Sequence, residues 1–389
     1  MKLFKNIIEQ LEPKFEKGGK LEKWFPIFDS LATFLFTPNH TTQKGAHVRD
    51  AIDLKRTMFM VIVAMLPCLL FGMWNVGYQH FLAIGEFNST LMDNMLFGAM
   101  KVLPLVAVSY GVGLGVEFAF CIVKKHTINE GFLVSGMLIP LCVPVDVPLW
   151  MVAVATVFAV VIGKEVFGGT GMNILNVALT TRAFLFFAYP TKMSGNAVWI
   201  NTEGGTVVDG FTGATPLADA IEGGTAAIPS LMDSFLGFIP GSVGETSTLA
   251  CLIGGAILLY MGIASWRVML SVFVGGAVMG LIFNILGPIY FPTNLYLQVD
   301  WLHQLVLGGF AFGAVFMATD PVTAAQTNTG KVIYGFFIGL LAILIRTVNP
   351  AYPEGMMMAI LFMNVMAPLI DHYVIQGNVK KRLKRLKTA

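Results

Sequence analysis

The sequence predicts an all-α integral membrane protein with about ten transmembrane helices, arranged as two five-helix inverted repeats that include broken helices. Of the 389 residues, 56% are hydrophobic and only 12% are charged, against about 25% charged residues in soluble proteins. The apolar runs are long and interrupted by Gly and Pro, as in transmembrane helices, whereas the strands of a membrane barrel would alternate. Basic residues concentrate on one predicted side of the membrane.

The composition limits the possible partners and cofactors. A net charge of +2 argues against a nucleic-acid partner. The chain has no Cys-x-x-Cys pattern, so we expect no zinc or iron–sulfur site within this chain alone, although a cluster shared with another chain stays open. Each of the 4 cysteines lies alone in an apolar run: Cys68, Cys121, Cys142 and Cys251.

Residues 1–56 form a basic segment, which we expect to be cytoplasmic and amphipathic. Its polar, charged composition predicts no cleavable signal peptide. Apolar residues recur at helical spacing from Leu3 to Phe15, and a second such pattern covers Leu21 to Phe36. The segment is either an interfacial or partner-docking element or an ordinary capping helix.

The first transmembrane half is predicted at residues 57–190. Its third apolar run is too short to cross a bilayer of about 30 Å as a regular helix and ends among prolines, so we expect a broken helix there. The five predicted spans lie near 57–76, 102–123, 131–143, 147–163 and 173–189.

A polar loop at 191–246 separates this half from the second, predicted at 247–374, and a basic tail follows at 375–389. The spans of the second half lie near 247–264, 268–288, 303–319, 331–348 and 355–373.

Ten spans put both termini on one side of the membrane. The N-terminal segment and the tail hold most of the Lys and Arg, and further basic residues fall in turns on the same side: Lys124, Lys125, Lys164, Arg267 and Lys331. The positive-inside rule therefore places both termini in the cytoplasm and the 191–246 loop in the periplasm.

The two halves resemble each other weakly. Pro140 closes the short third span, as Asp320-Pro321 closes the eighth, and Asn176-Val-Ala178 is similar to Asn364-Val-Met-Ala367. Five spans in each half imply repeats of inverted topology, whose broken helices meet at mid-membrane. Chance similarity among apolar segments is the alternative.

Ionisable residues inside predicted spans are costly and therefore candidates for function. Glu117 follows Gly113 and Gly115, which allow close approach of a backbone or a flat ring; alternatively, Glu117 reaches the headgroups. Asp320 precedes a proline that frees backbone carbonyls for an ion, or it caps a helix. Asp371 fits a solvated helix end.

Two arginines also lie in or at the ends of predicted spans. For Arg182 and Arg346 we expect one of three roles: reaching the membrane interface, pairing with a carboxylate, or facing a cofactor phosphate.

The polar loop contains Asp209-Gly-Phe-Thr-Gly-Ala-Thr215, followed by Pro216. These are ordinary turn residues, but small neighbours also leave the threonine hydroxyls clear. The chain has no phosphate-binding lysine loop, no His-Glu-x-x-His and no usable Ser-His-Asp order, so we expect no hydrolase.

The stretch matches the flavinylation motif Asp-x-x-Ser/Thr-Gly-Ala-Thr, and several further blocks support the match. Together they resemble the NqrB/RnfD family, whose members are membrane subunits of the sodium-translocating NADH:quinone oxidoreductases and of the related Rnf complexes. The blocks are Glu22-Lys-Trp-Phe25, His47-Val-Arg-Asp50, Asp53-Leu-Lys-Arg56, Lys164-Glu-Val-Phe-Gly-Gly-Thr-Gly171, Arg182-Ala-Phe-Leu-Phe-Phe-Ala-Tyr-Pro190 and Asn349-Pro-Ala-Tyr-Pro-Glu-Gly-Met356.

The resemblance implies a flavoprotein translocase in the bacterial inner membrane, with other subunits and a flavin transferase as partners. It implies covalent FMN on Thr215 through a phosphoester, with Asp209, Thr212, Gly213 and Ala214 completing the attachment motif. Electrons would pass through this FMN and a non-covalent riboflavin to quinone, coupled to Na⁺ export. The long N-terminal segment favours the quinone reductase over the ferredoxin-linked Rnf cousin, and a solute permease without redox activity is a third alternative.

The resemblance also assigns ion and quinone residues. It implies sodium roles for Glu117, Asp29, Asp371 and Asp320. The quinone site would involve Gly113, Leu114 and Glu117. The family has a second glycine where this chain has Leu114, which puts that contact in doubt.

Overall fold

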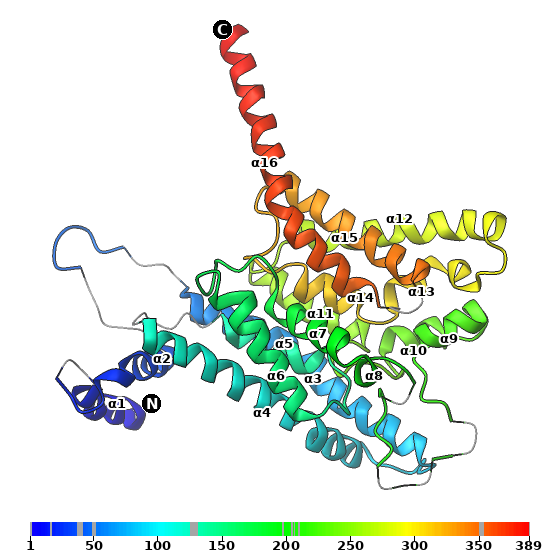
Figure 1. Ribbon diagram of the computed structural model, residues 1–389, viewed down its shortest axis with the longest axis horizontal. Coiled ribbons are helices and arrows are strands. Elements are labelled where there is room, and N and C mark those ends of the chain that lie inside the picture. Colours follow the sequence, from blue (N-terminus) through cyan, green and yellow to red (C-terminus); the bar gives the residue numbers. More distant parts are fainter. Residues whose placement is uncertain are drawn as a thin grey trace.

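The computed structural model describes residues 2–15, 18–36, 42–48, 52–124, 131–196, 198–203, 205, 207–208, 211–349 and 354–388. Regular structure in these ranges is helical throughout and includes no strand, which confirms the all-α fold (Figure 1). Among the described residues, five helices are long and apolar enough to cross a membrane. They are α3 (Leu54–Ala83), α4 (Leu91–Lys124), α12 (Trp266–Tyr290), α15 (Asn328–Val348) and α16 (Met356–Thr388).

Shorter apolar helices lie between the long ones: α5 (Phe132–Leu141), α6 (Leu149–Val160), α7 (Val177–Ala188) and α11 (Thr248–Tyr260). Helix α6 continues into a π-helical turn, η2 (Val161–Glu165). The run at 131–143 contains only the ten-residue α5, as expected for a broken helix.

The prediction of one continuous helix at 303–319 is wrong. It consists of α13 (Trp301–Val306), α14 (Phe310–Phe312) and the π-helical turn η5 (Gly313–Met317). The break falls at Leu307, whose backbone is extended, and at Gly308, whose φ of +63° favours glycine and ends a right-handed helix.

The first two spans are longer than expected, because residues 77–83 and 91–101 are also helical. Polar side chains in the extra turns are buried by pairing. His80 Nδ1 lies 2.6 Å from the carbonyl oxygen of Asn201, and the His80 ring stacks on Phe97 at 3.8 Å between centroids. These contacts extend α3 beyond the apolar run that marked the span.

The N-terminal segment contains α1 (Lys2–Phe15), η1 (Glu22–Trp24) and α2 (Phe25–Leu35). Phe15 stacks on Phe28 at 4.6 Å, which joins α1 to α2. Lys55 Nζ on α3 donates to Thr33 Oγ1 at 2.5 Å, so α2 is tied to the start of the first long helix.

The loop between the two halves contains short elements: α8 (Pro190–Met193), α9 (Pro216–Gly223), η3 (Gly224–Ala226) and α10 (Leu231–Leu236). It shares a small apolar core with the second half of the chain, in which Leu217 and Ala220 of α9 pack with Tyr296 from η4 (Leu295–Gln298). The loop is therefore folded, and α9 has a defined position.

Small residues bring α12 and α15 into close contact. A Cβ at Gly339 would overlap the backbone carbonyl of Val272, so this crossing needs glycine at that position. By contrast, a Cβ at Gly111 on α4 would meet nothing within 4 Å.

We therefore expect Gly339→Ala to destabilise the protein by about 1–3 kcal/mol, the usual cost of overpacking. Gly111→Ala is the matched control, because it makes the same change in a helix where space is open. Thermal unfolding of the two purified variants measures the difference. Equal unfolding temperatures would contradict the tight α12–α15 crossing.

Candidate functional site

Thr215 is the N-cap of α9. Its Oγ1 accepts a hydrogen bond from the backbone N–H of Ala218 at 3.4 Å, and Pro216 occupies the first helical position. Both features are typical of a helix start. Thr215 is half-buried, and its own backbone is extended and leads directly into the short helix α9.

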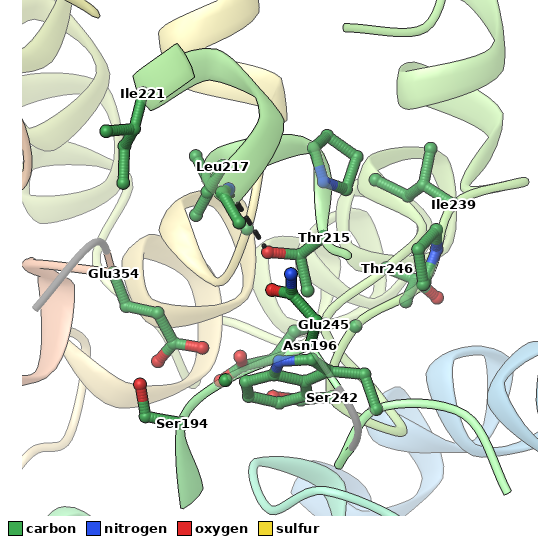
Figure 2. A pocket seen from close by; sticks show the side chains of 17 residues that line it. Ser194, Asn196, Thr215, Leu217, Ile221, Ile239, Ser242, Glu245, Thr246 and Glu354 are labelled. Atoms are coloured by element: carbon green, nitrogen blue, oxygen red, sulfur yellow. Dashed lines mark hydrogen bonds between the residues drawn. The ribbon is translucent and has the colours of Figure 1, made fainter. Parts of the chain in front are cut away.

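Thr215 opens into a pocket of about 200 Å³. Figure 2 shows its side chain above Asn196, with Glu354 on one side and Ile239 on the other. The walls are formed by residues 194–196, 199, 215–218, 221, 239–242, 245 and 246 of the inter-half loop, together with Gly308 from the break between α13 and α14 and Glu354 before α16. The pocket therefore combines the inter-half loop with the second half of the chain.

The motif around Thr215 is positioned by glycine. Gly213 is buried with a φ of +64°, and a Cβ there would lie 2.7 Å from the carbonyl oxygen of Asn196. Thr212 is exposed, and its Oγ1 accepts from the N–H of Ala214 at 3.4 Å. Asp209 lies outside the described residues. Only glycine satisfies both the backbone angle and the close approach at position 213.

Two carboxylates that line the pocket, those of Glu245 and Glu354, pair with a buried arginine. Arg182 on α7 donates to Glu245 Oε1 at 2.7 Å and to Ser242 Oγ at 3.4 Å, and it also pairs with Glu354. The side chains of Arg182 and Glu245 are only 6% and 4% exposed. Of the three roles expected for Arg182, the structure shows the pairing with carboxylates.

Arg346 has a different environment from the one expected. It is fully buried on α15 and donates to the carbonyl oxygens of Gln304 at 2.7 Å and Leu307 at 3.1 Å. It also donates to the carbonyl oxygen of Glu354 at 3.4 Å, and its Nε has no hydrogen-bond partner among the described residues. Arg346 therefore holds the backbone of the broken helix, where carbonyls lack helical partners.

Glu117 lies in a second charged cluster. It is 3% exposed on α4 and pairs with Lys164 of η2, which excludes the headgroup-reaching alternative. Beside this pair, Lys124 Nζ lies 3.7 Å from Glu165 Oε2. The second carboxylate oxygen of Glu117, Oε2, is buried without a hydrogen-bond partner among the described residues.

The two expected quinone residues on the same helix have different environments. Gly113 is buried, and the Phe132 ring occupies the place where its Cβ would lie. Leu114 is half-buried and packs against the core. Gly113 lies one turn before Glu117 on the same helix face.

Asp320 lies at a second pocket, of about 100 Å³, between the two halves. Its carboxylate accepts from Asn176 Nδ2 at 3.2 Å, from the N–H of Val322 at 3.0 Å and from Thr323 Oγ1 at 3.0 Å. Lys164 and Asn173 also line this pocket, which links it to the Glu117 cluster.

The remaining two acids are not brought together with these clusters. Asp371 on α16 accepts from the N–H groups of Gln326 at 2.6 Å and Thr327 at 3.0 Å, so it anchors the start of α15. Asp29 lies on α2 in the N-terminal segment, away from α16 (Figure 1).

Three of these charged residues were missed as site candidates. Lys164 counted as a basic residue in a turn and as part of a family block, Glu245 as part of the polar loop, and Glu354 as part of another family block. For Glu245, the one available signal was an isolated acid among small residues, Gly241-Ser-Val-Gly-Glu-Thr246. No group of three or more potential metal-binding side chains occurs in the described part of the chain.

Comparison with known proteins extends over nearly the whole chain. The chain is 49% identical to the subunit designated B of the Na(+)-translocating NADH-quinone reductase of Stutzerimonas stutzeri, over 97% of this chain and 98% of that protein. It is 50% identical to the subunit of the same name from Azotobacter vinelandii, again over 97% and 98%. The resemblance expected from the sequence motifs is therefore confirmed. The profile of the NQR2, RnfD, RnfE family matches residues 41–380, and the chain belongs to that family.

Proposed function

We propose that this chain is a membrane subunit of a sodium-pumping NADH:quinone oxidoreductase, which passes electrons through covalent FMN and riboflavin to quinone with coupled Na⁺ export. The observation that carries the proposal is Thr215, the last residue of the flavinylation motif, which opens into a pocket. Relatives covering 97% of the chain bear the name of such a subunit.

The residues around Thr215 fit an FMN phosphoester. Its hydroxyl oxygen only accepts a hydrogen bond, from the N–H of Ala218, so replacing the hydroxyl proton by phosphorus leaves that bond possible. The oxygen also lies at the N-terminus of α9, whose dipole stabilises a negative phosphate. Trp199, Leu217 and Ile221 offer apolar surface for a ring. FMN supplies the redox chemistry when bound, while these residues position it.

The second pocket is a candidate for riboflavin. It combines apolar walls from Val61, Leu258 and Phe316 with the amides of Asn173 and Asn176. An isoalloxazine ring needs such a combination of flat apolar surface and a few hydrogen-bonding groups at its edge. The chemistry of this lining supports a non-covalent flavin between the halves.

The Glu117 cluster supports a sodium role. Na⁺ prefers oxygen ligands, and Glu117 keeps one buried carboxylate oxygen without a partner among the described residues. The Lys164 ammonium group pairs with the other oxygen and supplies the compensating charge. We propose that Na⁺ replaces Lys164 at Glu117 during transport. Asp29, Asp320 and Asp371 stay candidates for other parts of the path, and Gly113 and Leu114 for the quinone site.

The proposed orientation has both termini in the cytoplasm and the Thr215 loop in the periplasm. Ten spans in two inverted five-helix repeats are part of the same proposal, as are a flavin transferase for maturation and a bacterial inner-membrane location. The breaks in α5 and in α13–α14 support the repeats, because each interrupts the third span of its half.

The main competing function is that of the Rnf cousin, since the family includes both types. The quinone reductase is favoured because relatives named as its subunits match 97% of the chain, including the N-terminal segment. Quinone reduction by NADH that responds to sodium in the native complex separates the two. A solute permease would show uptake without bound flavin.

We expect Thr215→Ala to abolish covalent flavin, because the motif's acceptor oxygen is removed. The measurement is flavin fluorescence of the band on a denaturing gel, after expression with a flavin transferase. Thr225→Ala is the control, since Thr225 lies in the same loop outside the motif. Fluorescence that survives in Thr215→Ala would place the flavin elsewhere.

We expect Glu117→Gln in the assembled complex to raise the sodium concentration for half-maximal quinone reduction at least tenfold. Because that change leaves Lys164 buried and unpaired, at a typical cost of about 3–5 kcal/mol, the double variant Glu117→Gln/Lys164→Met is needed as well. It removes both charges and should fold stably without regaining the sodium response. Glu86→Gln, at an exposed position, is the control. An unchanged sodium dependence in a stable double variant would exclude Glu117 from the path.

A further inference from the structure

The proposed attachment motif is packed into the fold on both sides of its acceptor residue. Among the motif residues that the structure describes, only Thr212 is exposed. Gly213 is buried against the backbone of Asn196, where a Cβ would lie 2.7 Å from the carbonyl oxygen. Pro216 and Leu217, which follow the motif, are buried as well. The acceptor hydroxyl therefore belongs to a segment that contacts the rest of the protein along most of its length.

Attachment of FMN through a phosphoester is a substitution at phosphorus. It needs a leaving group on the phosphorus, so the donor is a pyrophosphate ester of FMN such as FAD. The hydroxyl oxygen of Thr215 forms the new O–P bond, while the P–O bond to AMP breaks and AMP leaves with the electron pair. The hydroxyl proton passes to a base of the transferase, and nothing is oxidised or reduced. Because the attacking and leaving oxygens lie roughly in line, donor and transferase must both surround the hydroxyl.

The docked motif does not give this access. The Thr215 side chain faces a pocket of about 200 Å³ whose walls are other parts of the same chain (Figure 2), which leaves no room for FAD together with the side chains of a second protein. A general base must also come within about 2.6–3.2 Å of the hydroxyl. Thr215 Oγ1 already accepts a hydrogen bond from the N–H of Ala218 at 3.4 Å, which makes the oxygen a weaker nucleophile.

Helix α9 is held in place by a small set of contacts. Leu217 and Ala220 pack with Tyr296 and Val299 in an apolar cluster that is separate from the main core. Segments with few buried apolar contacts open locally far more often than the whole protein unfolds. With eight residues, α9 is too short to be stable as an isolated helix, so it unwinds when it leaves the cluster. Opening therefore also releases the acceptor hydroxyl from its backbone donor.

We propose that FMN is attached while α9 and the motif are undocked, and that α9 docks onto its apolar cluster afterwards. This inference rests on the function proposed above and sets the order of two steps, flavin transfer first and docking second. A chain in which α9 has already docked is modified only in proportion to the fraction of molecules that are open.

Flavin transfer to the purified chain tests this order. The full chain, expressed without a transferase, is placed in nanodiscs and incubated with flavin transferase and FAD, and in-gel fluorescence gives the attachment rate. Tyr296→Ala removes a large side chain from the cluster without changing the motif. We expect attachment at least about tenfold faster than in the wild type, because more molecules are open. Val299→Ala makes a smaller cavity and should give a smaller acceleration, which keeps the test valid if Tyr296→Ala does not fold.

Exposed positions supply the matched controls. Tyr290→Ala and Val348→Ala, at side chains that are 67% and 65% exposed, should leave the attachment rate at the wild-type value. Hydrogen exchange of the α9 amides in the unmodified chains should rise by the same factor as the attachment rate, since both report the open fraction. Unchanged attachment in a variant whose α9 exchanges faster would show that Thr215 is modified in the docked state, and would overturn the proposal.

The same gels separate this inference from the proposed function. Equal attachment rates in all folded chains overturn the order of the two steps and leave the FMN role of Thr215 standing. If no chain becomes fluorescent, even after expression together with the transferase, the attachment at Thr215 is overturned and this inference with it.

Discussion

The structure depends on the buried pairing of Arg182 with Glu245 and Glu354. A charge in an apolar interior is tolerated only when it is paired, and removing one partner typically costs about 3–5 kcal/mol. Arg182 belongs to the first half, Glu245 to the segment that enters α11, and Glu354 to the segment that enters α16. One guanidinium group therefore holds three distant parts of the chain together beneath Thr215.

The same physical rule shapes the opposite cluster. Glu117 and Lys164 are each 3% exposed and pair with one another, while Lys164 also lines the pocket between the halves. Glu117 and Arg182 lie inside helices, but each has a partner at a helix end or break: Lys164 in the π-helical turn η2 for Glu117, and Glu245 before α11 for Arg182. Broken helices leave backbone groups unpaired, so polar side chains collect there and create sites where unbroken helices would give only apolar contact.

Local patterns and family blocks were enough to predict the helical class, the break at 131–143 and the family. Span ends were less predictable, because tertiary contacts decide them. Helix α3 continues past its apolar run since Asn201 and Phe97 pair with His80. The single span expected at 303–319 failed for a similar reason: Arg346, on a different helix, binds the carbonyls that the break exposes.

The sequence by itself determined the membrane class and singled out Thr215 as the proposed attachment residue, because hydropathy and a short motif are local properties. It also determined that Glu117 is an acid within an apolar helix. Only the tertiary structure decided that Thr215 faces a pocket lined by Glu245 and Glu354, the two partners of Arg182, and that Glu117 pairs with Lys164. Lys164 lies 47 residues from Glu117 along the chain, and Glu354 lies 172 residues from Arg182. The periodicity of apolar residues along a sequence does not indicate which distant charged residues will pair when the helices pack.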